Sequence, residues 1–441
     1  MSLFGSMNTA ISGLTAQAAA FSNISDDVAN SQTVGFKRVD TSFSDFLTAS
    51  TATVNESGAV IATPDYVNDV QGTIAQTDHP LGMAITGEGF FAVSEATSNN
   101  AAAGGTPTFS TQQYYTRAGD FTLDKNGYMV NSADQYLNGW SVDPTTGQVD
   151  RNDLAPIQVS QSVYNPVATS QVTLAANLPA TPAASTTMPI SSQVTVYDSL
   201  GTQHTVTLNW TQNADSDWTV DVQVPGDTSG NSDRGTAEVQ FGALSGNNVP
   251  EGTVGLVGNA TGTVSASSYS ANGPASLTFT TNLGEGNQAI TLNLGDYGGS
   301  NGLTQFAGTN YSLHGLTQNG VPPGSYSSVT TTSAGDIVVN YGNGQSRTIA
   351  RVPIVTFNSP DSLQRQNGQA FTATIGSGTP NTQDAGTNGA GDIVTGSVEQ
   401  SNVDIATEFS KLIVAQQAYS ANTKVVTTAN DLLQQTINMK T

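Results

Sequence analysis

Chemically reactive side chains are scarce in this chain, and the most suggestive group surrounds Ser300. Gly298-Gly299-Ser300-Asn301-Gly302 matches the G-x-S-x-G pattern of a serine hydrolase, and His314 follows downstream. In a hydrolase of this type the serine lies on a strand-to-helix turn, and an acidic residue comes between the serine and the histidine. No Asp or Glu lies between Ser300 and His314, and the flanking sequence predicts a loop. We therefore expect no hydrolase site here.

Two further patterns predict backbone turns in place of ligand sites. Gly87-Glu88-Gly89-Phe90-Phe91-Ala92 loosely matches a dinucleotide fingerprint. Its glycines precede a predicted strand, whereas the fingerprint follows a strand and begins a helix. Asp124-Lys125-Asn126-Gly127 is similar to part of a calcium loop, but the first loop position would be Thr122 and the bidentate acid would be Ala133. These four residues therefore predict a hairpin turn.

Metal and catalytic ligands are equally sparse. His79, His204 and His314 fall in three different predicted regions, and the chain has no cysteine. The main local basic patch, Gly35-Phe36-Lys37-Arg38, is interpreted as a connector contact or a solvated face, in preference to a phosphate site. We predict no catalytic residue, no cofactor and no metal ion, and hence no enzyme.

The composition excludes several classes of protein. The 441 residues include 12 Lys and Arg against 34 Asp and Glu, so the net charge of −22 provides no basic surface for nucleic acid. Charged residues make up 10% of the chain, less than half the usual share of ~25%. No run approaches the ~18 apolar residues that a membrane span requires, and the N-terminus does not resemble a cleaved signal peptide. We expect a β-rich extracellular protein that is exported by another route and is not inserted in a membrane.

Both ends of the chain predict long amphipathic helices. Apolar residues recur there at spacings of three and four, which is nearly a heptad pattern. Neither end contains proline, and each helix would run ~40 to 50 Å at about 1.5 Å per residue. The apolar positions are Phe4, Met7, Ile11, Leu14, Phe21, Ile24 and Val28 in the first helix and Ile405, Phe409, Leu412, Tyr419, Val426, Leu433 and Ile437 in the second.

The interior, from about Gly58 to about Gly396, consists of short Val, Thr, Tyr and Phe runs separated by Gly, Asn, Asp and Pro, which is typical of β structure. Turns that contain Asn-Gly predict hairpins over 121–130 and 337–349, and a turn that contains Asp and Gly predicts another over 194–208. A further strand is expected from Trp218 to Val224. The Gly-, Thr- and Asn-rich stretch from Ser377 to Gly391 predicts a mobile loop, and Asn99 to Pro107 a shorter loop.

The predicted fold is mainly β with α-helical N- and C-termini, arranged as nested discontinuous domains. Asn165-Pro166 and Val321-Pro322-Pro323-Gly324 mark the boundaries of the middle block. The expected parts are a helical polymerisation domain (1–30 with 399–441), a connector (31–70 with 393–398), a split β domain (71–160 with 326–392) and an inserted outer β domain (161–325).

The paired helical ends predict self-assembly. Two helices bury one narrow seam and leave Ala-rich and Gln-rich faces, such as Ala16 to Ala20 and Gln434-Gln435, which are neither charged nor strongly apolar. Such faces suit packing against identical neighbours. The alternative is an intramolecular coiled-coil stalk, but its flanking positions would normally carry more charge. A bare helix pair is marginally stable, so ordering on assembly stays open.

Several stretches along the whole chain, in the correct order, resemble the hook proteins of the flagellar rod, hook and hook-associated family. Asn30 to Lys37 resembles the N-terminal signature of that family, and Thr86 to Val93 and Tyr115 to Phe121 its first β region. Val196 to Gly201 with His204 is similar to the start of the middle domain, and Gly396 to Asp404 and Gln417 to Asn422 to the closing helix. The Gly-rich stretch from Gly252 to Gly302 departs from the family pattern. The matching positions are Asn30, Thr33, Gly35, Phe36, Lys37, Gly87, Gly89, Phe90, Phe91, Asp198, Ser199, Leu200, Gly201, Ser401, Asn402 and Val403.

The resemblance implies a structural subunit of the bacterial flagellar hook. It implies a helical tube outside the cell, in which the end helices line a channel, the split β domain surrounds them and the middle domain is outermost. Such a tube acts as a bendable universal joint that carries motor torque to the filament. The implied partners are many copies of the chain, the distal rod, the hook cap, the hook–filament junction proteins and the flagellar type III export apparatus, which needs no cleaved signal peptide.

Three alternatives are weaker. A distal rod subunit would share both termini, but rod proteins are usually shorter and lack so large a middle domain. A secreted β-rich adhesin would need aromatic platforms, for which Trp140, Trp210 and Trp218 are the tryptophan candidates. We expect Trp210 and Trp218 to face a local core instead. A secreted hydrolase is the weakest of the three because no triad is predicted.

Overall fold

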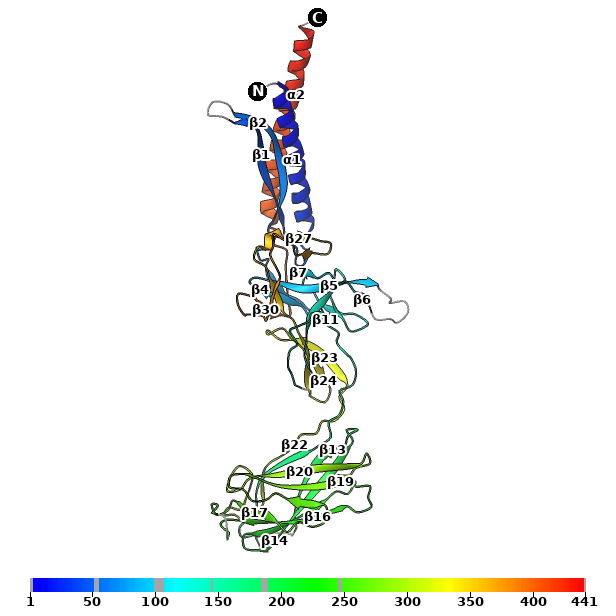
Figure 1. Cartoon of the computed structure of the whole chain (residues 1–441), viewed down its shortest axis with the longest axis vertical. Coiled ribbons are helices and arrows are strands. Elements are labelled where there is room, and N and C mark those ends of the chain that lie inside the picture. Colours follow the sequence, from blue (N-terminus) through cyan, green and yellow to red (C-terminus); the bar gives the residue numbers. More distant parts are fainter. Residues whose placement is uncertain are drawn as a thin grey trace. The chain divides into compact units, whose positions relative to one another are not determined.

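The computed structural model describes residues 3–50, 55–98, 107–143, 146–183, 189–244 and 248–439. Its two compact units are Met1–Gln161 with Ser327–Asn340 and Ser346–Thr441, and Ser162–Tyr326 with Tyr341–Gln345. Strands fill the interior of the sequence, and the two α-helices lie at its ends (Figure 1). The predicted fold class, mainly β with helical termini, is confirmed. Of the predicted loop Asn99 to Pro107, residues 99–106 lie outside the described residues.

The two terminal helices, α1 (Leu3–Ala29) and α2 (Ile405–Asn438), pack against each other (Figure 1). A Cβ placed on Gly13 of α1 would lie 2.9 Å from the Asn422 side-chain nitrogen of α2, so the helices are in close contact there. The Phe21 and Tyr419 rings meet edge to face with centroids 6.3 Å apart. The two predicted helices and their pairing are confirmed.

The second helix begins later than the predicted helical segment. Asp404 caps α2, because its side chain accepts hydrogen bonds from the Ala406 and Thr407 amides at 2.9 and 3.2 Å. Of residues 399–404, which we assigned to the helical domain, Glu399 ends β31 and the others lie before α2, outside any helix. This segment reaches back toward the residues that follow α1.

A two-stranded antiparallel ribbon lies along α1 (Figure 1). It is formed by β1 (Val39–Ser50) and β2 (Asn55–Tyr66), with Val39 opposite Tyr66. The Asn23 side chain donates to the Thr41 hydroxyl at 2.8 Å, and the Val60 amide donates to the Ser12 hydroxyl at 3.0 Å. We predicted only a connector over 31–70, because Ser, Thr, Asp and Glu dilute the apolar alternation there.

The rest of this unit is a β domain in which the two halves of the chain pair with each other. β5 pairs with β26, β7 with β28, β10 with β25, and β4 with β30. The strands are β3 (Ile74–Gln76), β4 (Met83–Thr86), β5 (Phe90–Ser98), β6 (Thr108–Phe109), β7 (Tyr114–Thr116), β8 (Thr122–Leu123), β9 (Met129–Val130), β10 (Gln135–Ser141), β11 (Ala155–Pro156), β23 (Tyr326–Thr331), β24 (Asp336–Tyr341), β25 (Ser346–Arg351), β26 (Ile354–Thr356), β27 (Gln364–Arg365), β28 (Ala370–Thr372), β29 (Asn381–Gln383), β30 (Asp392–Thr395) and β31 (Ser397–Glu399), with a 3₁₀ turn, η2, at Pro360–Ser362.

The predicted hairpins of this domain are present. β8 pairs with β9 around Gly127, whose φ is 83°, and the Asp124 carboxylate accepts from the Asn126 and Tyr128 amides at 2.8 and 2.7 Å. Asp124 thus closes a turn. β24 pairs with β25 around Gly344. The predicted mobile loop from Ser377 to Gly391 is wrong in part, because β29 within it pairs with β26 and Ser377 is fully buried.

The second unit contains two sheets. One runs β13-β14-β15-β16-β17, and the other runs β18-β19-β20-β12-β21 with β22 beside β12. Side chains alternate between buried and exposed along β13, β14, β15 and β19, as expected for strands with one face on a core. The strands are β12 (Gln171–Asn177), β13 (Ile190–Tyr197), β14 (Gln203–Ala214), β15 (Asp217–Gln223), β16 (Asp233–Phe241), β17 (Val254–Gly258), β18 (Val264–Ala266), β19 (Pro274–Asn282), β20 (Asn287–Asp296), β21 (Leu303–Thr304) and β22 (Ser312–Gln318).

Trp210 and Trp218 are fully buried in the core of this second unit, as predicted, so neither can form an exposed aromatic platform. The Gly-rich stretch from Gly252 to Gly302 supplies strands β17 to β20 of the same core. Ser300 lies in the bend between β20 and β21, and His314 lies exposed on β22. The strand-to-helix turn of a serine hydrolase is not found at Ser300.

The second unit is expected to fold without the rest of the chain, because it has its own core. A fragment spanning residues 162–326 should unfold cooperatively, with tryptophan emission shifting from a buried to an exposed maximum. Leu208→Ala, at a position 1% exposed, should lower its free energy of unfolding by about 2–5 kcal/mol. Leu256→Ala, at a position 38% exposed, should change it by about 0.5 kcal/mol or less. Equal losses in a urea titration would contradict this description of the core.

Candidate self-assembly site

The segment that follows α1 turns back sharply onto the β domain. The Thr33 hydroxyl donates to the Asn30 side-chain oxygen at 3.2 Å, in the turn after Ala29. Gly35 has a φ of 70°, and a Cβ on it would lie 2.3 Å from the Ala118 backbone nitrogen. Both the conformation and the close approach require glycine at this position.

Backbone and amide hydrogen bonds tie this segment to the one that precedes α2. The Gly35 amide donates to the Glu399 carbonyl at 2.8 Å, and the Asn402 amide donates to the Phe36 carbonyl at 3.4 Å. The Asn402 side chain accepts from the Arg38 amide at 2.8 Å and donates to the Val67 and Val70 carbonyls at 3.1 Å. The two ends of the chain are therefore joined at the base of the helices. Beside them, Ser401 is buried, and its hydroxyl accepts from the Val403 amide at 3.3 Å.

A buried ionic cluster lies at this joint. Lys37 Nζ is 2.6 Å from one oxygen of the Glu399 carboxylate, and Arg117 Nη1 is 2.9 Å from the other. The three side chains are 1%, 0% and 2% exposed for Lys37, Glu399 and Arg117. Burial lowers the pKa of Lys37, and Glu399 opposes that effect. Lys37 thus makes a connector contact, one of the two predicted alternatives, and does not lie on a solvated face.

Each charge in the cluster has further hydrogen bonds, as a buried charge requires. Lys37 donates to the Val70 carbonyl at 2.7 Å, and Glu399 accepts from the Gly72 amide at 2.8 Å. Arg117 donates to the Ile85 and Gly87 carbonyls at 3.2 and 2.7 Å. The cluster therefore holds the two ends of the chain against the β domain.

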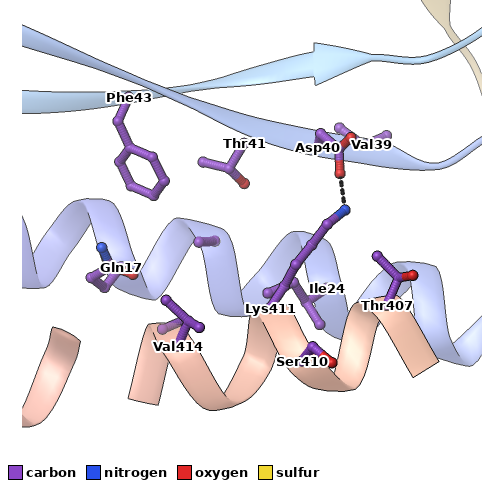
Figure 2. A pocket seen from close by; sticks show the side chains of 12 residues that line it. Gln17, Ile24, Val39, Asp40, Thr41, Phe43, Thr407, Ser410, Lys411 and Val414 are labelled. Atoms are coloured by element: carbon purple, nitrogen blue, oxygen red, sulfur yellow. Dashed lines mark hydrogen bonds and ion pairs between the residues drawn. The ribbon is translucent and has the colours of Figure 1, made fainter. Parts of the chain in front are cut away.

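A second group of charges lies where α1, α2 and β1 meet. Lys411 of α2 donates to Glu408 at 2.7 Å and pairs with Asp40 of β1 (Figure 2). Although burial acts to lower it, the pKa of Lys411 is raised by these hydrogen bonds. Both oxygens of the buried Asp27 carboxyl accept from the Val39 amide, at 3.1 and 3.2 Å. Burial raises the pKa of Asp27 to about 7, and the nearby Glu408, Asp26 and Asp40 carboxylates add to that increase.

A cavity of about 590 Å³ opens beside these charges, between the two helices and the ribbon (Figure 2). Apolar side chains, including Ile24, Val414 and Phe43, line part of it, and the Lys411–Asp40 pair lies near one end. The helix pair and the ribbon are therefore incompletely packed.

The helix pair buries mainly small residues. Ala10, Ala16 and Ala20 of α1 and Ala415 and Ala429 of α2 are 4–5% exposed. Small side chains let the two backbones approach closely, as the contact at Gly13 shows. The predicted outer alanine face is therefore wrong for Ala16 and Ala20, which are buried, whereas Ala18 and Ala19 are exposed.

Of the fourteen large apolar residues in the predicted stripes, eight are buried or half-buried and six are exposed. Ile24 is buried, and Met7, Leu14, Phe21, Val28, Leu412, Val426 and Leu433 are half-buried. Four large apolar residues of α2 that were not in the predicted stripes are exposed: Ile413, Val414, Val425 and Leu432. The exposed members of the stripes are Phe4, Ile11, Ile405, Phe409, Tyr419 and Ile437.

The remaining signature positions lie in the β structure, at the start of β5 and in the turn between β13 and β14. Gly87 and Gly89, with φ of 102° and 123°, precede β5, and Phe90 and Phe91 begin it in the core. The prediction that these glycines lead into a strand is confirmed. Asp198, Ser199, Leu200 and Gly201 form the β13–β14 turn of the second unit, where the buried Asp198 accepts from the Leu200 and Thr202 amides and from His204.

Among the described residues, no three His, Asp or Glu side chains gather so as to hold a metal ion. No described helix combines the length and the apolar character needed to cross a bilayer.

Of the charges in the two clusters, only Lys37 was singled out from the sequence, as part of the basic patch and of the family signature. Arg117 and Glu399 fell inside stretches chosen for family resemblance, and Asp27, Asp40, Glu408 and Lys411 were passed over. The feature of the sequence that could have drawn attention to these side chains is the rarity of charge, because charged residues make up only 10% of this chain. A carboxylate flanked by apolar residues is, in such a sequence, a candidate for burial.

Comparison with known proteins identifies the family. A Brucella abortus protein described as flagellar hook protein FlgE is 32% identical over 444 residues, and the match covers 100% of both chains. The chain belongs to the flagellar hook protein family. Proteins of the same description from Rhizobium meliloti and Salmonella typhimurium are 29% and 27% identical, over 100% and 99% of this chain and 100% of theirs. The resemblance found in the residues alone is thus confirmed.

Three family descriptions match successive parts of this hook-family chain. They are the flagellar hook protein FlgE/F/G D1 domain over residues 84–177, the flagellar basal body protein FlaE D2 domain over 168–321, and the flagellar basal body rod FlgEFG protein C-terminal over 394–439. The crystal structure of Helicobacter pylori flagellar hook protein FlgE2 matches 72% of this chain and 98% of that one, at 14% identity with a TM-score of 0.47.

Glu399→Ala is expected to destabilise the protein strongly, because it leaves the buried Lys37 and Arg117 cations without their carboxylate. The expected loss in free energy of unfolding is about 3–5 kcal/mol, measured by denaturant titration with circular dichroism. The control is Asp384→Ala, which removes the carboxylate that pairs with Arg151, 53% exposed, and with Arg351, 27% exposed. This control should cost about 1 kcal/mol or less. A loss no larger for Glu399→Ala than for the control would show that the cluster does not stabilise the joint.

Proposed function

We propose that this chain, a structural subunit of the flagellar hook, polymerises by packing its helical ends and their ribbon against those of identical neighbours. The observation that carries this proposal is the exposure of large apolar residues on the helix pair. Phe409, Ile413 and Val414 are 51%, 53% and 65% exposed, and Phe4 and Ile437 are each 64% exposed. Scattered apolar residues are common on protein surfaces, but so many on two adjacent helices mark an interaction surface.

The energetics favour assembly over an isolated helix pair. Complete burial of a Leu, Ile or Phe side chain is worth about 1.5–3 kcal/mol. The pair buries several alanines and leaves these larger residues exposed. Contact with neighbouring subunits would therefore bury apolar surface that the monomer leaves in water. The ribbon adds Phe46 and Ile61, which are 59% and 43% exposed. An intramolecular stalk does not use these residues.

The resulting polymer is a flexible helical tube in the flagellum outside the cell, which bends while it carries motor torque to the filament. The low content of charged residues supports bending, because subunit surfaces rich in Ser, Thr and Asn exchange weak polar contacts at small cost. A dense network of ion pairs would favour one register. We further propose that the distal rod, the hook cap, the hook–filament junction proteins and the flagellar type III export apparatus are its partners. Export uses no cleaved signal peptide, and the chain has no enzymatic role.

The exposed apolar residues of α2 give a direct test of assembly. The double change Phe409→Gln and Ile413→Gln should abolish tube formation, or raise the critical concentration at least about tenfold, because two side chains worth about 1.5–3 kcal/mol each no longer become buried. Electron microscopy and sedimentation measure the polymer, and circular dichroism checks that the subunit folds. Leu256→Gln with Leu313→Gln changes two exposed apolar residues of the second unit, outside the helical ends and their ribbon, and should leave assembly intact. Normal tubes from the Phe409/Ile413 variant would disprove the role of this surface.

The cellular role is tested by removing the gene from its host. Electron microscopy should then show the loss of the curved segment between motor and filament, and motility should be lost. Expression of the chain without residues 405–441 should not restore either property. Intact, rotating flagella in the deletion strain would contradict the proposed hook function.

A further inference from the structure

We propose that the junction of α1, α2 and β1 is a proton-controlled latch, in which the Asp27 carboxyl holds a proton when the three elements are docked. The first observation is the balance of charge. The described charged side chains at this junction include the carboxyls of Asp26, Asp27, Asp40 and Glu408, and the cations of Arg38, Lys411 and Arg365. With the exposed Asp65, which lies opposite Asp40 in the ribbon, the carboxyls outnumber the cations, and a proton on one of them reduces this excess.

The positions of the carboxyls decide which one carries the proton. Three of them already face a cation: Asp26 accepts from Arg365 at 3.4 Å, Asp40 pairs with Lys411 and with Arg38, and Glu408 accepts from Lys411 at 2.7 Å. Asp27 is fully buried, and its recorded partner is the Val39 amide. The Val39 amide bond favours the ionised carboxylate and acts to lower the pKa of Asp27, but the loss of hydration on burial outweighs it, so Asp27 is the most costly of the four to ionise.

The helix dipoles act in the same direction. Asp27 lies in the last turn of α1, where the negative end of the dipole disfavours an anion. Glu408 lies in the first turn of α2, where the positive end favours one. The pKa of Asp27, which burial raises to about 7, agrees with this assignment.

A second group of atoms supports the presence of a proton. The Glu408 Oε2 atom is buried and accepts no hydrogen bond from any described residue, while Glu408 acts on the charge of Asp27. An ionised Asp27 would be repelled by the Glu408 carboxylate, whose charge acts to raise the pKa of Asp27. Loss of the proton therefore weakens the docking of α2 and β1 against the end of α1, beside a cavity that already interrupts their packing.

The direction of the pH effect follows from the two states of the latch. In the undocked chain Asp27 titrates near the ordinary value of 3.8, and in the docked chain near 7. The docked state therefore binds more protons between these values, and docking weakens as pH rises across this range. The stabilisation of the docked state by the Asp27 proton is fully present below pH 3.8. Between pH 3.8 and about 7 the docking equilibrium constant falls by up to about tenfold per pH unit, and above about pH 7 no further stabilisation remains.

The latch itself does not depend on the function of the polymer, but its consequence for assembly rests on the proposed function. If the helical ends pack against neighbours, the proton on Asp27 determines how rigidly each subunit presents them. Polymers formed at pH 6 are then expected to have better ordered helical ends than polymers formed at pH 8.

Hydrogen exchange of the full-length chain tests the latch, with rates corrected for the intrinsic effect of pH. Protection of the α1 and β1 peptides should fall by about tenfold to thirtyfold between pH 5.5 and 7, and stay level above pH 7.5. Asp27→Asn, which is neutral at every pH, should show high protection with no such fall. Asp45→Asn changes an exposed carboxyl of β1, away from the junction, and should behave like the unchanged chain.

A second variant keeps the test decisive if Asp27→Asn does not fold. Glu408→Gln removes a charge that raises the pKa of Asp27, so the pH range of the fall should end below 7. The carboxyl carbon chemical shift of Asp27 gives its titration directly. Equal pH profiles for the unchanged chain and Asp27→Asn, an Asp27 titration near 4, or no protection of the junction at any pH would each overturn the latch. These readouts use unassembled protein, so a failure of polymerisation alone would count against the proposed function and leave the latch standing.

Discussion

The constraint on which the rest of the structure depends is the burial of one carboxylate, Glu399, between Lys37 and Arg117. These three residues are far apart in the sequence, and their charges can be buried only together, because each alone would be costly in the interior. Their meeting places the segment after α1 beside the segment before α2. The pairing of the helices, the start of the ribbon at Val39 and the closure of the β domain all follow from this joint. In a chain with so few charges, the ionic cluster specifies where the two ends of the protein meet.

Above the joint, packing follows a different principle. The helices approach closely through glycine and alanine, and several large apolar residues of the same two helices remain exposed. A seam of Leu and Ile would have made a more stable pair and a poorer building block, since little apolar surface would remain for neighbours. The incomplete packing between the helices and the ribbon belongs to the same compromise. The fold therefore separates the residues that stabilise the subunit, which are in the β cores and the ionic joint, from those available for association.

The sequence predicted the kinds of elements and missed several of their contacts. Helical periodicity at the ends, Asn-Gly turns and the burial of Trp210 and Trp218 follow from local rules, and each was found. The ribbon of β1 and β2 was missed because Ser, Thr, Asp and Glu obscure its alternation. Burial on the helices was predicted only in part, because hydrophobicity was taken as the guide to burial, whereas close packing also buries Ala16 and Ala20. The ionic joint could not be located, because Lys37, Arg117 and Glu399 become neighbours only through the complete topology. The division into four parts stays a prediction, although the paired flanks of the β domain agree with it.

The way in which the chain enters and leaves the second unit has an evolutionary consequence. The Tyr164 amide donates to the Gly324 carbonyl at 2.7 Å, and Val167 and Val321 form the next bridge. The unit thus begins and ends on adjacent antiparallel strands, so its two termini are one strand spacing apart. A domain with neighbouring termini can be lost, enlarged or exchanged without moving the residues on either side of it. Natural selection can therefore vary this unit as a cassette, while the helical ends and their ionic joint are inherited together.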